Sequence, residues 1–128
     1  MRALLDTHAF IWWASDDESL TPVARNAIGD RANEVFLSAA STWEMAIKIA
    51  IGKLTLRLPL SDFVLSQISQ YQFRQLPITY SHTYKVRELP LLHRDPFDRL
   101  LIAQAMVENL VILTADHAFQ PYGVTILW

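Results

Sequence analysis

Short, continuously apolar segments alternate with longer segments of helical character, and this alternation most constrains the fold. The clearest apolar segments are RALLD at 2–6, EVFLS at 34–38 and VILTAD at 111–116, and each indicates a buried strand. Further strands are expected in GVTILW at 123–128 and within FRQLPIT at 73–79. Apolar strands separated by helices predict an α/β fold, with three α/β/α layers around a central parallel sheet.

The segment over 39–54 gives the clearest helical pattern. Trp43, Ile47 and Ile51 recur every four residues, and Gly52 is a suitable C-cap. The other helices are expected at 7–15, at 21–32 with Thr21 as N-cap and Pro22 at the first helical position, at 60–71 with Ser61 as cap, at 81–89, and at 95–110 with Pro96 in the first turn.

The length of 128 residues predicts a single domain over 1–128. The chain has no cysteine, which excludes disulfides and thiolate metal sites and suits a cytoplasmic protein. Asp6 and His8 interrupt the apolar N-terminal stretch, so we expect neither a signal peptide nor a membrane span. Because the net charge is −2, a nucleic-acid partner would have to be held by local Arg and Lys clusters.

Four acidic residues occupy positions that a parallel sheet can bring together. Asp6 and Asp116 each end an apolar strand segment, Asp98 lies at the start of the longest helix, and Glu44 lies on the helix that follows EVFLS. Ligands of such sheets bind beyond the carboxyl ends of the strands. Clustered carboxylates repel one another unless a cation lies among them, and an all-oxygen site suits Mg²⁺ or Mn²⁺ better than Zn²⁺.

Each acid also has a purely structural interpretation. Asp98 can complement the helix dipole, Glu44 can pair with Lys48 one turn later, and Asp6 and Asp116 can be turn residues. Glu44 and Asp98, however, both lie inside otherwise apolar helical stretches. The joint arrangement favours a metal site.

Four stretches of the sequence resemble the PIN domain family, in its VapC-like toxin branch. They are LLDTHAFIWW, SAASTWEMAIKIAIGKL, HRDPFDRLLIAQA and LTADHAFQPYGVTILW, in the family's order and over nearly the whole chain. The resemblance implies a PIN-like fold and a ribonuclease that depends on Mg²⁺ or Mn²⁺. It also implies a homodimer, and a VapB-like antitoxin that neutralises the enzyme.

Carried over by position, the family's acidic quartet falls on Asp6, Glu44, Asp98 and Asp116. We expect Asp6 and Asp98 to contact the ion directly. Asp116 would help to hold a water molecule or a second ion, and Glu44 would be a ligand or a general base. Asp95 matches an additional acid of this branch, and Thr114 matches a supporting position.

Several other residues are weaker candidates. Thr7 and Ser38 either hydrogen-bond the carboxylates or cap helices. The candidate RNA contacts are Lys48, Arg94, Arg99 and His93, with solvated surface charges as the alternative. For His93 and His117, a surface position or an RNA contact is favoured over metal ligation. Base stacking is one option for the tryptophans, but we expect packing for most of Trp12, Trp13, Trp43 and Trp128.

Other functions remain open at this point. A phosphoacceptor receiver domain needs paired acids after its first strand and a lysine near its end, but Thr7 and His8 follow Asp6, and Lys85 is the last lysine. A phosphatase with an Asp-x-Asp motif is disfavoured by DTH. A non-catalytic α/β signalling module is disfavoured by the four acids. A PIN-type nuclease that processes RNA or cuts DNA, without a toxin role, stays an alternative.

Overall fold

A five-stranded, entirely parallel sheet lies at the centre of the molecule, as the alternation predicted. The structure is a computed structural model that describes residues 1–128. The strands are arranged in the order β3-β2-β1-β4-β5. Their bounds are β1 Arg2–Leu5, β2 Glu34–Ser38, β3 Arg74–Leu76, β4 Val111–Leu113 and β5 Ile126–Leu127. Because β1 lies between β2 and β4, the chain segments after these three strands meet at one edge of the sheet.

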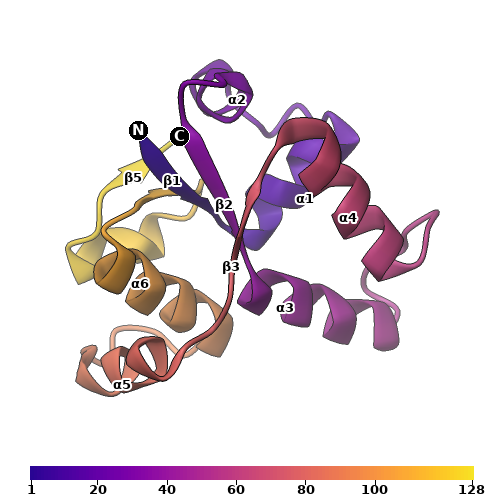
Figure 1. The fold of residues 1–128 in the computed structure, drawn as a ribbon. Helices are drawn as coiled ribbons and strands as arrows, with labels where there is room; N and C mark the ends of the chain where they lie inside the picture. Colours follow the sequence, from indigo (N-terminus) through magenta and orange to yellow (C-terminus); the bar gives the residue numbers. More distant parts are fainter.

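Helices cover both faces of the sheet, which confirms the three-layer prediction. They are α1 Thr7–Ser15, α2 Pro22–Gly29, α3 Ala39–Ala50, α4 Leu60–Tyr71, α5 Tyr80–Glu88, α6 Pro96–Glu108 and the 3₁₀ helix η1 His117–Tyr122. Figure 1 shows α5 and α6 on one side of the sheet and α1 and α4 on the other, with α3 continuing beyond the end of β2.

Each face of the sheet has its own apolar core. The first core includes Ala9 and Phe10 of α1 and Ile28 of α2. The second includes Leu101 and Ile102 of α6. Strand side chains alternate between the two cores: in β1, Ala3 and Leu5 belong to the first and Leu4 to the second. Burial on both faces explains why the strands are apolar throughout.

Thr21 and Pro22 begin α2 as predicted, and the Thr21 hydroxyl accepts the amide hydrogen of Ala24 at 3.1 Å. Ser61 is not a cap, because Pro59 occupies the N-cap position of α4 and Ser61 is already helical. The helix expected over 39–54 ends at Ala50, with Gly52 at φ +77° just beyond its end. The helix expected over 21–32 ends at Gly29.

Two strands are also shorter than the apolar segments that indicated them. β4 ends at Leu113 rather than Asp116, and β5 contains only Ile126 and Leu127. The pairing extends slightly past these bounds, because the amide of Thr114 donates to the carbonyl of Leu127 at 3.3 Å and the amide of Ile112 donates to the carbonyl of Thr125 at 2.9 Å.

The regular stripe on α3 faces outward. Trp43 is 54% exposed and Ile51 is 59% exposed, with Ile47 also exposed between them. The buried face carries Ala40, Ser41, Glu44 and Met45 instead. α4 likewise has no fully buried residue. Both helices therefore keep apolar surface available. No helix is both long and apolar enough to cross a membrane.

Candidate active site

Asp6 links the end of β1 to the start of α1. Its Oδ1 accepts the amide hydrogen of Ala9 at 2.7 Å as the N-cap of α1. Its Oδ2 accepts the hydroxyl hydrogen of Thr114 at 2.5 Å. Burial raises the pKa of Asp6, while the bonds from Thr114 and Ala9 oppose that shift. The carboxylate is thus held rigidly by two elements at opposite ends of the sequence.

Asp98 lies in the first turn of α6, shortly after the N-cap Asp95. The pKa of Asp98 is raised to about 7, first by burial and then by the negative charges of Asp95, Glu44, Asp6 and Asp116. The predicted quartet therefore lies within electrostatic range of one carboxyl group. Asp95 caps the helix by accepting the amide hydrogens of Phe97 and Asp98.

The other two acids of the quartet differ in exposure. Glu44 is buried on the inner face of α3, where its Oε2 lies 3.1 Å from Nζ of Lys48. The i,i+4 pairing considered from the sequence is therefore present. Asp116 is exposed and caps η1 by accepting the amide hydrogen of Ala118 at 2.9 Å.

The three hydroxyl candidates behave differently. Thr114 supports the site directly through its bond to Asp6, and its Oγ1 also accepts the amide hydrogen of Asp116 at 3.0 Å. Thr7 donates to Oγ of Ser41 at 3.0 Å. Ser38 caps α3 and donates to Gln104 Oε1 at 2.5 Å. The hydroxyls of Thr7 and Ser38 make no hydrogen bond to a carboxylate.

The structure corrects the prediction that Arg99 contacts RNA. Arg99 is buried and donates to the carbonyls of Pro90 and Val86 and to the hydroxyl of Tyr122. No sequence signal could have indicated this, because an Arg at that helical position is equally compatible with solvent. Arg94 is exposed as expected. His93 is largely buried and bonded to Tyr122.

Three of the four tryptophans pack within the molecule. Trp12 lies against Trp128, with ring centroids 5.7 Å apart, and Trp13 lies against Tyr71 at 5.0 Å. Trp43 is the exception. It meets Phe97 of α6 edge-on at 4.8 Å and remains half exposed, one residue before Glu44 in the sequence.

The sequence matches the family model described as the PIN domain over residues 3–124. The chain belongs to the PIN domain family. The Mycobacterium tuberculosis protein named Ribonuclease VapC22 is 29% identical to it over 120 residues, covering 93% of this chain and 90% of that protein.

Solved structures share this PIN fold. VapBC2 from Rickettsia felis, crystallised with a promoter DNA fragment, superposes with a TM-score of 0.74 at 15% identity, covering 100% of this chain and 99% of the other. VapBC-1 from nontypeable Haemophilus influenzae gives 0.65 at 15% identity, covering 99% and 97%. FitAcB from Neisseria gonorrhoeae gives 0.60 at 20% identity, covering 98% and 96%.

The donor chemistry of this PIN site fits a divalent cation. The acids that act on Asp98 are all carboxylates, the ligands that Mg²⁺ and Mn²⁺ prefer. In the present arrangement, no three Asp, Glu or His side chains converge tightly enough to form a complete ligand cage. Ion binding would therefore require the side chains to close around it, and Asp98 would have to lose its proton.

The raised pKa of Asp98 predicts how the metal-free PIN domain responds to pH. The folded state binds this proton more tightly than the unfolded state, whose carboxyl keeps the ordinary pKa of 3.8. The resulting stabilisation is fully present below that value and is lost as the pH rises through about 7. We expect Asp98→Asn to melt progressively higher than wild type as the pH is raised from about 5 to about 8 in EDTA.

Melting curves across this pH range test the expectation. The exposed Asp62 of α4 offers a matched control, since Asp62→Asn removes an acid from a solvated helix start. A difference between Asp98→Asn and wild type that is the same at every pH would contradict a site-induced pKa shift.

Proposed function

We propose that this chain is a divalent-metal-dependent endoribonuclease and the toxin component of a toxin–antitoxin pair. The observation that carries the proposal is the gathering of Asp95, Glu44, Asp6 and Asp116 around the half-buried Asp98 of a PIN domain, where burial first and these charges second raise the pKa of Asp98. Carboxylates that raise the pKa of a neighbouring carboxyl toward neutral pH are typical of a site that binds a cation. The ribonuclease name of the Mycobacterium relative supports RNA as the substrate.

In this proposal Asp6, Asp98, Asp116 and Glu44 would hold Mg²⁺ or Mn²⁺ for the hydrolysis of an RNA phosphodiester. A divalent ion supplies charge neutralisation, a lower pKa for an attacking water and stabilisation of the departing oxygen. Asp6 is kept in place by Ala9 and Thr114, so the other acids would close around a carboxylate of fixed orientation. Glu44 can accept a proton once its pairing with Lys48 loosens.

RNA would reach the site past α3 and the segment before α6, where the remaining candidate contacts lie. Arg94 is exposed and Lys48 is only partly buried, so both remain candidate phosphate contacts. The half-exposed ring of Trp43 lies against Phe97 of α6 and can stack on a base. Arg99 takes no part, because its guanidinium is committed to internal acceptors.

We also propose a homodimer and a VapB-like antitoxin in the cytoplasm. Apolar residues of α3 are exposed, and α4 has no fully buried residue. A contiguous exposed apolar surface of this kind is typical of a protein–protein interface. The related VapBC2 structure is by its title a complex bound to promoter DNA, which supports a partner of that kind here. Light scattering of the isolated chain tests the dimer.

A cleavage assay tests the activity. We expect purified protein to cut single-stranded cellular RNA with added Mg²⁺ or Mn²⁺, to be inactive in EDTA, and to regain activity when the ion is restored. A DNA strand of the same sequence should remain intact. Equal cleavage of RNA in EDTA would refute the metal-dependent mechanism, and preferential cleavage of DNA would refute the RNA assignment.

A further inference from the structure

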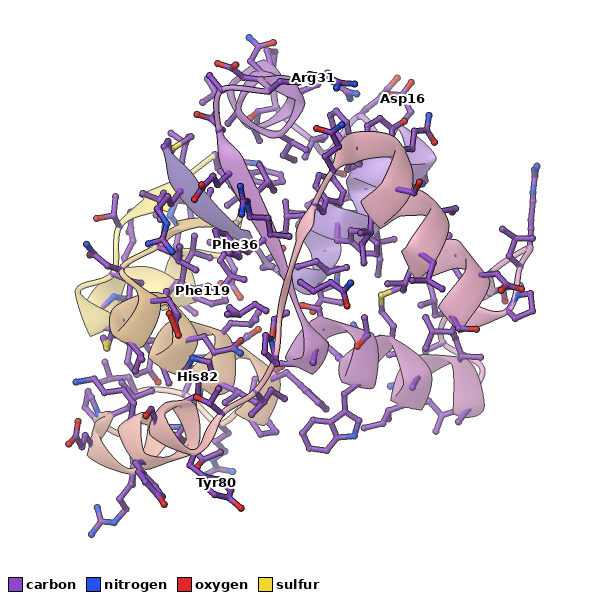
Figure 2. The ribbon with its side chains drawn as sticks, viewed as in Figure 1. Asp16, Arg31, Phe36, Tyr80, His82 and Phe119 are labelled. Carbon is purple, nitrogen blue, oxygen red and sulfur yellow. The ribbon has the colours of Figure 1, made fainter.

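The hydroxyl of Tyr122 joins two residues of the HRDPFDR segment that the proposed mechanism does not use. Tyr122 lies at the end of η1 and is buried. Its oxygen lies 3.2 Å from the backbone nitrogen of His93, 2.7 Å from Nδ1 of the same residue and 3.2 Å from Nη1 of Arg99. The His93 and Tyr122 rings meet edge-on, with centroids 5.3 Å apart. This packing fixes the orientation of the imidazole. Figure 2 shows the neighbouring Phe119 of η1 pointing into the interior beside α6.

The number of hydrogens at this oxygen decides which nitrogen of His93 carries the proton. A tyrosine hydroxyl has one hydrogen to donate and can accept from others. The backbone amide of His93 and the guanidinium of Arg99 can only donate, so both of their bonds end on the Tyr122 oxygen. The single hydroxyl hydrogen is then left for Nδ1, which must be the unprotonated nitrogen.

The remaining ring nitrogen faces the acidic site. Nε2 of His93 is buried, has no hydrogen-bond partner, and lies 3.5 Å from Oδ2 of Asp98. A formed N–H···O bond is about half an ångström shorter. A buried N–H without an acceptor is costly, and Asp98 is the carboxylate that it faces. A small rotation of the carboxylate would complete the bond.

We propose that His93 is a positioning residue that donates from Nε2 to Oδ2 of Asp98 and leaves the other carboxylate oxygen free for the cation. Tyr122 holds His93 in the required tautomer, and Arg99 orients the Tyr122 hydroxyl. This inference rests on the proposed function, because it assumes that Asp98 holds the ion. It assigns His93 and Arg99 to the support of the site rather than to RNA.

The arrangement suits a metal ligand for two reasons. A neutral imidazole restrains the carboxylate without adding a positive charge that would compete with the ion. The Arg99 guanidinium donates to the carbonyls of Pro90 and Val86 and to the Tyr122 hydroxyl, and it forms no salt bridge with Asp98. Supporting residues of this type typically change metal affinity by about 10- to 100-fold.

The first test reads the tautomer directly in the metal-free protein. Nitrogen-15 spectra recorded above about pH 8, where imidazole is ordinarily neutral, should show His93 protonated at Nε2 alone. Tyr122→Phe should give a mixture of tautomers, whereas Tyr84→Phe, which changes an exposed tyrosine of α5, should not alter the signal. Circular dichroism would verify that each variant is folded. A His93 protonated at Nδ1 in the wild type would overturn the proposal.

The second test measures Mn²⁺ affinity by calorimetry. We expect His93→Leu to weaken binding by about tenfold or more, and His93→Gln, which keeps a donor, to restore part of the loss. If the wild type binds Mn²⁺ and folded His93→Leu binds it equally well, only the positioning role is wrong. If the wild type binds no Mn²⁺, the metal-dependent function is wrong and the positioning role fails with it.

Discussion

We expect Asp6→Asn to lower the rate of RNA cleavage by at least about a hundredfold. Loss of a residue that only supports a metal ligand costs up to about that factor, and Asp6 is proposed to be a ligand itself. The change removes the negative charge and keeps the shape. Asparagine Oδ1 can still accept from Ala9 as the N-cap of α1. The Thr114 hydroxyl can turn to accept from the new amide, because it is a donor and an acceptor.

Stability should be preserved in the same variant, since burial already disfavours the charged form and raises the pKa of Asp6. Cleavage rates and urea unfolding curves, measured side by side, separate loss of chemistry from loss of fold. Asp62→Asn, at the exposed start of α4, should cleave at the wild-type rate. Wild-type cleavage by folded Asp6→Asn would remove Asp6 from the active site.

The largest expected loss of stability follows from Phe10→Ala. Phe10 is fully buried in the first core, where its ring meets Phe63 of α4 and Phe73 edge-on, at 5.6 and 6.2 Å. Removing such a ring costs about 3–5 kcal/mol, a large part of the roughly 5–15 kcal/mol that holds a typical domain folded. We expect the free energy of unfolding to fall by this amount in urea denaturation.

The loss of local stability should be greatest in α4, because α4 has no fully buried residue of its own. Hydrogen exchange in Phe10→Ala should therefore accelerate more in α4 than in α6. Leu91→Ala provides the control, because Leu91 is 90% exposed and its truncation should change stability by less than about 0.5 kcal/mol. Equal acceleration in α4 and α6 would show that the two faces of the sheet unfold together.

The architecture was predictable because its signals are local. Runs such as RALLD and EVFLS are apolar on both faces, which only a sheet covered on both sides requires. The placing of Asp6 and Asp98 followed from the same reasoning, since each lies where a regular element starts or ends. That these acids perturb one another agrees with this prediction, whereas their catalytic roles stay predictions until they are tested.

The details that sequence could not supply depend on three-dimensional neighbours. Ser61 is a good capping residue, yet Pro59 begins the helix first. The stripe of Trp43, Ile47 and Ile51 correctly indicated a helix but faces outward, because periodicity does not say which side meets the core. Tyr122 joins Arg99 and His93 from 23 and 29 residues away in the sequence, and no local pattern marks that meeting.

The hydrogen bond between Thr114 and Asp6 spans 108 residues, and this has a consequence for the timing of synthesis. A ribosome makes the chain from its N-terminus, so Asp6, Glu44 and Asp98 are all translated before β4 and the segment after it that carries Thr114 and Asp116. β1 also lacks its β4 neighbour until then. A growing polypeptide that has not yet reached Thr114 consequently has three of the four acids but lacks Asp116 and the Thr114 bond to Asp6. The acidic site of an enzyme that would attack cellular RNA is therefore assembled only after β4 and the residues that follow it have been made.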